Sequence, residues 1–438
     1  MHWTRAALIL CAAVAGCRFS VDGIDTNGAG GGDMDLATGG GGSVDMAGCM
    51  CATGCSTSAT TCLALQPSGP VTAGDYQQAN LINANVTANI VIDTDSGQIT
   101  GGLIRPAGAG VLGGVGFRTT TQAGGPGAGI FSVAGLTLAA GAKVTFKGAN
   151  AFALASAGNV TLDGTVDASC TANVPGPGGF AGGVQMDGKG PGAGKRGEHI
   201  NGSAGGGGAG YGDGGGTGGL LATQTSNGGA IWGDLTPATF VLAGGSGGGA
   251  GGDSGGNGGS GGGAVMFAVN GVLRVGGTIH VGGCGGLHGD KDKGGGGGGS
   301  GGAIVLEASS IALTSTAVLA SNGGGGAAGT DMSKSGGDAL AAVTAALGGT
   351  TMAPTGGSGG NGGASNGMPG LHFTNGRDGL IPNAVTGFGG GGGGGVGRIA
   401  VRAQAGGISD SSTAVTPDAA DSNKSGAHPT VYGVAKFQ

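Results

Sequence analysis

Two tandem segments decide the predicted fold: Gly262–Gly286 (GGAVMFAVNGVLRVGGTIHVGGCGG) and Gly301–Gly326 (GGAIVLEASSIALTSTAVLASNGGGG). Each begins with GGA, continues through three short apolar stretches and ends in a run of glycine. Apolar stretches of this length, separated by tight turns, indicate an all-β structure. Three strands in each repeat are typical of a parallel β-solenoid, in which a repeat buries its apolar residues only against neighbouring repeats.

Apolar pairs at matching positions extend this pattern along the chain. The first strand gives Phe152/Leu154, Val265/Phe267, Ile304/Leu306 and Ile399/Val401. The second strand gives Val160/Leu162, Leu273/Val275 and Ile311/Leu313, and the third gives Val166/Ala168, Ile279/Val281 and Ala317/Leu319. The period of two predicts that these pairs face a common core, and that Glu307, Arg398 and Arg402 point outward. We therefore predict a parallel β-helix over residues 71–438.

Glycine-rich insertions interrupt the repeats at about 171–261, 287–300 and 323–396. Each follows a third strand and precedes a first strand, so all three should leave the β-helix at one corner. Glycine supplies 118 of the 438 residues, and ordering glycine is entropically costly. The insertions are therefore either mobile or packed as extended glycine strands that hydrogen-bond to each other. The stretch DALAAVTAAL (338–347) predicts a short helical turn with Asp338 as N-cap.

The composition excludes several classes of protein. Hydrophobic residues make up 38% of the chain and charged residues only 10%, unlike a charge-rich disordered polymer. The net charge of −6 comes without a basic patch, so we expect no nucleic-acid partner. No apolar run reaches the roughly 18–20 residues that a membrane-spanning helix needs.

The N-terminus resembles that of a bacterial lipoprotein. Residues 1–16 have the short basic and apolar regions of a signal peptide, and they end in Val-Ala-Gly before Cys17. This is similar to a lipobox, which implies that Cys17 is lipidated and anchors the chain to a membrane. Arg18 in place of aspartate implies the outer membrane. Residues 17–47 are rich in glycine and aspartate and predict a flexible tether.

Six cysteines are candidates for disulfides. In an exported chain, four within residues 48–70 predict two disulfides in a small knot, with a zinc site as the alternative: Cys49, Cys51, Cys55 and Cys62. Cys170 and Cys284 follow equivalent third strands, so we expect them to lie close enough for a disulfide. The alternative is a metal site, for which His280, His288 and Asp290 are weak candidates beside Cys284.

Residues 130–405 resemble the glycine-rich, right-handed β-helix proteins of bacterial cell surfaces, many of which are lipoproteins. The likeness lies in DGTVDASC (163–170), GGTIHVGGCGG (276–286) and STAVLASNGGGG (315–326). It implies a right-handed β-helix, exposed at the surface of the outer membrane. The composition is also similar to the glycine repeats of PE-PGRS surface proteins, whose Pro-Glu domain this chain lacks.

Enzymes built on β-helices often act on polysaccharides through carboxylates that share a groove. Two pairs of aspartates lie close in the sequence: Asp163 with Asp167, and Asp93 with Asp95. The position of Asp167 is taken by His280 or Val318 in other repeats, so no ladder of acidic residues is expected. The pattern GGAGGD (248–253) fits part of a calcium turn but lacks its buried apolar residue.

We therefore expect a non-catalytic structural or adhesive surface protein without a cofactor. Its expected partners are the membrane, through the lipid, and extracellular polysaccharide or a neighbouring cell surface. A polysaccharide lyase or hydrolase and a glycan-binding or ice-binding module are the alternatives.

Overall fold

The computed structural model describes residues 64–199, 202–219, 226–237, 239–330, 333–351, 356–364, 388–412, 414–417 and 430–437. The chain divides into two compact units, Met1–Leu63 and Ala64–Gln438, and every described residue belongs to the second. This unit is nearly all β with curled sheets, and its one helix among the described residues is α1 (Ala73–Tyr76). The predicted all-β class is confirmed.

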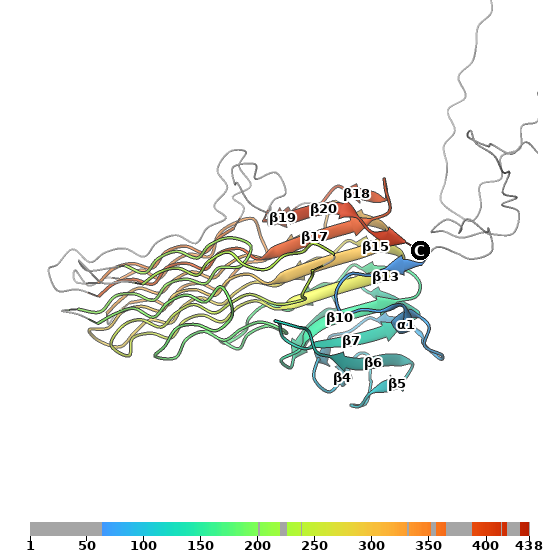
Figure 1. The fold of residues 1–438 in the computed structure, drawn as a ribbon, viewed down its shortest axis with the longest axis horizontal. Helices are drawn as coiled ribbons and strands as arrows, with labels where there is room; N and C mark the ends of the chain where they lie inside the picture. The colour runs from blue at the N-terminus through green and yellow to red at the C-terminus, as the bar shows by residue number, and fades with distance from the viewer. Residues whose placement is uncertain are drawn as a thin grey trace, which may run out of the picture. The chain divides into compact units, whose positions relative to one another are not determined.

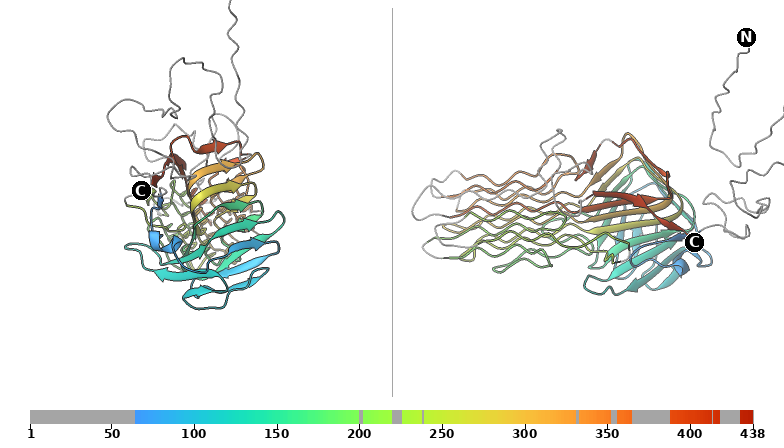
Figure 2. Two further views of the ribbon diagram at one scale, coloured as in Figure 1. Left: turned by 90° about the vertical axis from the view of Figure 1, so that its right-hand side faces the viewer. Right: turned by 45° about the horizontal axis from the view of Figure 1, so that its top comes forward.

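Most strands belong to three parallel ladders (Figures 1 and 2). The first ladder contains β7 (Ala128–Val133), β10 (Ala151–Ser156), β13 (Ala264–Val275), β15 (Ala303–Leu313), β17 (Arg398–Ala403) and β20 (Thr430–Val434). The second contains β2 (Asn83–Val86), β8 (Gly135–Leu138), β11 (Val160–Leu162), the C-terminal parts of β13 and β15, and β18 (Ile408–Asp410). The third contains β3 (Ile90–Asp93), β9 (Lys143–Lys147), β12 (Thr165–Asp167), β14 (Thr278–His280), β16 (Val318–Ala320) and β19 (Ala414–Thr416).

The remaining strands pair antiparallel at the edges of these ladders. They are β4 (Ile99–Gly101) on β3, β5 (Gly110–Leu112) on β6 (Val115–Thr120), β6 on β7, and β1 (Leu65–Gln66) on β21 (Lys436–Phe437). An uncovered edge strand offers unpaired backbone groups to other chains. β5 and β6 cover that edge of the first ladder.

The strand register agrees with the predicted alignment in the first and second ladders. Phe152 pairs with Val265, Val265 with Ile304, and Ile304 with Ile399. The alignment of the third ladder is wrong by two residues in one repeat, because Ile279 pairs with Leu319. Four residues separate β15 from β16, whereas two separate β13 from β14, and the longer turn moves the register.

The predicted apolar pairs face one continuous core between the ladders. Four phenylalanines from successive rows stack along it, with ring centroids 4.8 Å, 5.5 Å and 5.9 Å apart: Phe117, Phe131, Phe152 and Phe267. Offset and tilted aromatic pairs at this spacing add stabilisation beyond their buried area.

The first ladder is also buried on its opposite face, against a second apolar cluster that includes Ala153, Met266 and Val305. The predicted exposure of the outward charged residues is therefore wrong. Glu307 and Arg402 do lie away from the main core, but they are 2% and 3% exposed, and Arg398 is 3% exposed. Residues buried on both faces of a parallel strand read as a nearly continuous apolar run, as AVMFAV (264–269) does.

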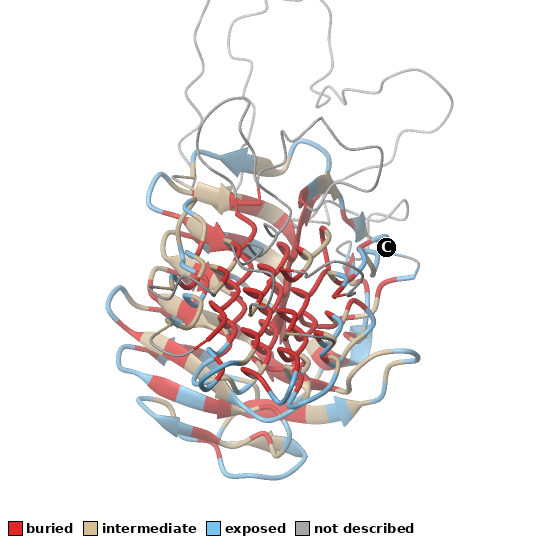
Figure 3. Cartoon of the chain, turned by 90° about the vertical axis from the view of Figure 1, so that its left-hand side faces the viewer, coloured by how far each residue is buried: buried red, intermediate tan, exposed pale blue. Residues whose placement is uncertain are grey.

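The described glycine-rich residues of the three insertions, here called the glycine bundle, project together from one side of the ladders (Figure 1). They run as extended, roughly aligned rods that have no regular strand assignment. Figure 3 looks along these rods and shows buried residues at the centre of the array and exposed residues around it. Of the two predicted alternatives, the described residues of the insertions take the packed one.

Hydrogen bonds within the glycine bundle follow a period of three. The rod of residues 294–302 donates amides to three other rods in rotation. The amides of Gly295, Gly298 and Gly301 donate to the carbonyls of Gly389, Gly392 and Gly395 on a first rod. Those of Gly296, Gly299 and Gly302 donate to the carbonyls of Leu287, Cys284 and Val281 on a second rod. Those of Gly297 and Ser300 donate to the carbonyls of Gly249 and Ser246 on a third rod. The carbonyls of the same rod accept hydrogen bonds from the amides of three further rods: Gly206 and Ala209, Gly259 and Gly262, and Gly324 and Ala327. Three residues per turn is the geometry of the polyproline II helix, so each rod is a polyglycine chain with that geometry. The rod of residues 294–302 has six hydrogen-bonded neighbours, three that accept from it and three that donate to it.

This packing explains the glycine content. A Cβ built on Gly297 would lie 2.1 Å from the carbonyl oxygen of Gly207, and one on Gly299 would lie 2.1 Å from that of Ser260. Both positions have ordinary negative φ, so the requirement for glycine comes from the close approach of other rods. Collagen places glycine at its axis for the same steric reason.

The predicted helical turn over 338–347 is wrong, since none of these residues is helical. Asp338 accepts a hydrogen bond from the amide of Gly285 at 2.9 Å and does not cap a helix. The Asn322 amide donates to the carbonyls of Leu340 and Ala342. Bonds to the glycine bundle therefore replace the local helical bonds.

Candidate functional site

The candidate site is a groove of about 440 Å³ on the outer face of the third ladder, at the root of the glycine bundle. β9 and β12 form its floor, and residues 171–177 form one wall. Because side chains alternate along a strand, Lys143, Thr145 and Lys147 face the groove while Val144 packs in the core.

Asp167 is the centre of the polar contacts in this groove. Its Oδ2 lies 2.7 Å from Lys143 Nζ, its Oδ1 accepts from Ser169 Oγ at 2.5 Å, and His280 Nδ1 lies 3.6 Å away. Burial alone would raise the pKa of Asp167, but His280, Lys143 and Ser169 outweigh it and hold the pKa far below its usual range. The carboxyl is therefore ionised at neutral pH.

A second ion pair lies beside the groove, between Lys147 and Asp93 on β3, with Nζ and Oδ2 3.5 Å apart. Burial raises the pKa of Asp93, whereas the amides of Ser96 and Asp95 lower it by more, so this carboxyl is ionised as well. Asp95 accepts from the amides of Ala149 and Asn150, and thus fixes a turn next to β9.

The geometry does not form a nucleophilic triad. In a Ser-His-Asp triad the histidine stands between the nucleophile and the carboxylate. Here Asp167 stands between Ser169 and His280, and the other ring nitrogen of His280, Nε2, is buried without a hydrogen-bond partner. Neither Asp167 in the groove nor Asp93 beside it has the raised pKa that a general acid requires.

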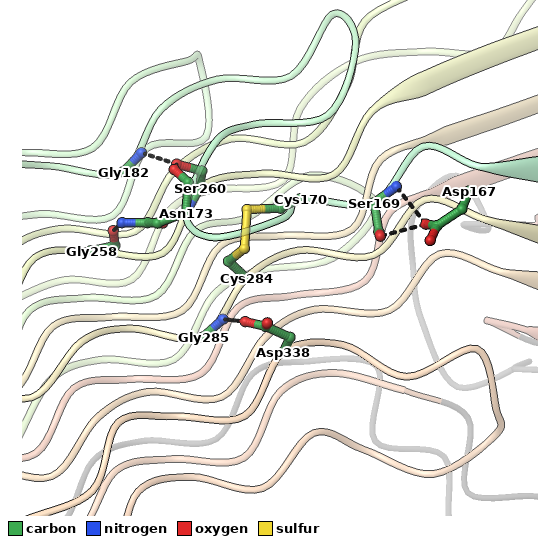
Figure 4. Close-up of a disulfide and its surroundings, with 10 residues drawn as sticks. All are labelled: Asp167, Ser169, Cys170, Asn173, Gly182, Gly258, Ser260, Cys284, Gly285 and Asp338. Carbon is green, nitrogen blue, oxygen red and sulfur yellow. Dashed lines mark hydrogen bonds between the residues drawn. A yellow bond between two sulfur atoms is a disulfide. The ribbon is translucent and has the colours of Figure 1, made fainter. Parts of the chain in front are cut away.

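A disulfide between Cys170 and Cys284 holds the wall of the groove in place (Figure 4). Cys170 and Cys284, which the predicted stacking of third strands places close together, are thus joined in the structure. Asn173, three residues further on, donates to the carbonyl of Gly258 at 3.0 Å and accepts from the amide of Ser260 at 2.7 Å. The wall is therefore attached to two neighbouring glycine rods, the one that contains Cys284 and the one that contains Gly258 and Ser260.

The weak metal candidates are not brought together. Cys284 is in the disulfide, His280 lies against Asp167, and His288 and Asp290 are exposed beyond the rod that contains Cys284. Within the described ranges, no three histidine, cysteine or acidic side chains are grouped as metal ligands would be. Asp253 of the calcium-like pattern lies at the turn between two glycine rods, with φ of +52°.

The remaining predicted acidic residue, Asp163, pairs with the exposed side chain of Arg274. Register confirms that His280 occupies the position of Asp167 in the next row, but the row after has Ala320, so the prediction of Val318 is wrong. Cys17, Cys49, Cys51, Cys55 and Cys62 lie outside the described residues.

Sequence reasoning missed Lys143, Lys147 and Ser169. A signal for the first two exists in KVTFK (143–147), where apolar residues alternate with polar ones.

No helix in the described part of the chain is long and apolar enough to cross a membrane. The chain matches no family model, no curated protein and no solved structure.

Proposed function

We propose that this chain is a non-catalytic, surface-exposed lipoprotein of the outer membrane, with a structural or adhesive role. In this proposal the ladders are successive turns of a right-handed parallel β-helix, which is attached to the membrane through a lipid on Cys17. The β-helix presents the glycine bundle to the surroundings of the cell.

The observation that carries the proposal is the glycine bundle. Three insertions, separated in the sequence by strands of the ladders, lie on one side and share a single hydrogen-bonded array. The interior of this array consists mostly of backbone groups that are hydrogen-bonded to each other. Such a construction supports a role as a spacer or contact surface.

Two further observations support this assignment. The disulfide between Cys170 and Cys284 is of the kind that persists in exported proteins. Glycoside hydrolysis needs one carboxylic acid of raised pKa, whereas the pKa values of Asp167 and Asp93 are both lowered. The groove is thus better suited to binding than to hydrolysis.

Metabolic labelling with palmitate, combined with protease treatment of intact cells, tests the proposal. We expect the wild-type chain to be labelled and to be cleaved from outside, and Cys17→Ala to lose the label. An unlabelled wild-type chain that resists protease on intact cells would contradict the anchoring. Turnover of any polysaccharide by the purified protein would contradict the non-catalytic role.

A further inference from the structure

We propose that the groove between β9, β12 and residues 171–177 binds an uncharged glycan through pairs of neighbouring sugar hydroxyls. This inference rests on the proposed surface role and names the chemical class of the partner. It comes from three features of the groove: its paired charges, its apolar wall and its fixed shape.

The paired charges match the chemistry of a sugar diol. A hydroxyl both donates and accepts hydrogen bonds, an ammonium group only donates and a carboxylate only accepts. Lys143 Nζ and Asp167 Oδ2, 2.7 Å apart, can therefore bind two adjacent hydroxyls at once. The lysine side chain is 45% exposed and Asp167 is 19% exposed, so both remain open to a ligand.

A second pair extends the same chemistry along the strand. Lys147, 55% exposed, also lines the groove, and its Nζ lies 3.5 Å from Oδ2 of Asp93, which belongs to β3 on the other side of β9. Lys143 and Lys147 are four residues apart on β9, or about 13 Å at the rise of an extended strand. That separation fits a short oligosaccharide lying along β9 better than a single sugar ring.

The wall of the groove supplies an apolar surface. Val174 is 65% exposed, and Pro175 and Pro177 line the groove beside it. The C–H face of a sugar ring packs against such a surface, while the hydroxyls at its edge reach the charged pairs. Binding sites commonly combine a mostly apolar lining with a few placed polar groups.

The charge balance favours a neutral ligand. Each lysine of the groove has a carboxylate as its partner, so the two pairs carry no net charge. Asp167 and Asp93 offset the charge of the two lysines, and this weakens the attraction of an acidic polysaccharide.

The wall need not be ordered by the ligand. It is fixed by the Cys170–Cys284 disulfide and by the bonds of Asn173 to Gly258 and Ser260 (Figure 4). A preformed site avoids the entropic cost of ordering a loop upon binding.

The test measures binding of the purified full-length protein to immobilised dextran, mannan, galactan and polygalacturonate. We expect saturable binding to at least one neutral polymer. Lys143→Ala should raise its Kd at least tenfold, and so should Val174→Asp. Lys195→Ala, which alters an exposed ion pair with Asp187 outside the groove, should leave Kd unchanged. Both groove positions are exposed enough for the variants to fold.

Three results would overturn the inference: no binding to any neutral polymer, stronger binding to polygalacturonate, or equal losses in the groove variants and Lys195→Ala. Binding by the purified protein does not depend on the lipid, so Cys17→Ala should bind as the wild type does. Failure of the glycan assay therefore leaves the anchoring proposal standing, and failure of palmitate labelling leaves the groove assignment standing.

Discussion

Glu307 and Arg402 form an ion pair with Oε1 and Nη1 2.6 Å apart, and their side chains are only 3% and 4% exposed. Ser68 completes the pair, since its amide and hydroxyl donate to the Glu307 carboxylate at 2.8 Å and 2.6 Å. Arg402 also donates to the carbonyl of Leu235. The pair thus joins β15 and β17 to two segments far away in the sequence.

We predict that Glu307→Leu lowers the free energy of unfolding by about 3–5 kcal/mol, because it leaves the charge of Arg402 buried without the carboxylate that neutralises it. The double variant Glu307→Leu/Arg402→Met should recover most of this loss. Urea unfolding followed by circular dichroism measures both. Lys195→Ala, in a pair whose side chains are 61% and 46% exposed, should cost less than about 1 kcal/mol. A Glu307 variant as mild as this control would contradict the prediction.

A single methyl group inside the glycine bundle should be poorly tolerated. We predict that Gly297→Ala destabilises the array by about 1–3 kcal/mol or more, because the new Cβ would overlap the carbonyl of Gly207. Gly337→Ala is the matched control, since its Cβ would meet Leu347 only at 3.4 Å. Amide hydrogen exchange should show faster exchange around residues 294–302 in Gly297→Ala alone. Equal protection in the two variants would show that the rods are not in close contact.

The disulfide should contribute strongly to stability. Cys170 and Cys284 are 114 residues apart, and the chain-entropy model gives about 5 kcal/mol for closing such a loop. We predict that Cys170→Ser/Cys284→Ser unfolds at a clearly lower urea concentration than the wild type. Reductant should lower the midpoint of the wild type at least as far as the double substitution does. If reductant leaves the wild-type midpoint unchanged, this disulfide is not formed in solution.

Acid should weaken the attachment of the segment around α1. Burial raises the pKa of Asp75, but Arg118 and the amide of Thr72 lower it by more, so its folded pKa is below the ordinary value. A lowered pKa gives stability that is complete above the unfolded value of about 3.9 and is lost as pH falls below it. The Tm of the wild type should therefore fall more steeply between pH 5 and pH 3 than that of Asp75→Asn. Parallel Tm profiles would contradict this role of Asp75.

The sequence predicted the ladders because side-chain alternation records which face of a strand is buried. Phe152, Val265, Ile304 and Ile399 could be aligned from their apolar neighbours alone, and the structure pairs them in that order. The third ladder was misaligned at Leu319 because register there depends on the length of a polar turn. The apolar pattern alone does not show where the turn between β15 and β16 ends and the next strand begins.

The glycine bundle and the groove were harder to predict, for different reasons. Glycine has no side chain, so its sequence holds no trace of which rod faces which neighbour. The pairing of Lys143 with Asp167 arises only when β9 and β12 lie side by side. The burial of Glu307 could not be foreseen, because the segment that covers it comes from near residue 68.

The period of three in the glycine bundle also raises a problem of register. A rod made only of glycine could slide by three residues, about 9 Å, and form the same hydrogen bonds again. The rare side chains remove this ambiguity: the amide of Ser246 donates to Ser300 Oγ at 2.8 Å, and Tyr211 Oη donates to the carbonyl of Ala243 at 2.9 Å. These few side chains fix the register of one rod against the next. A rod can therefore become longer without changing its hydrogen-bond pattern only in steps of three residues.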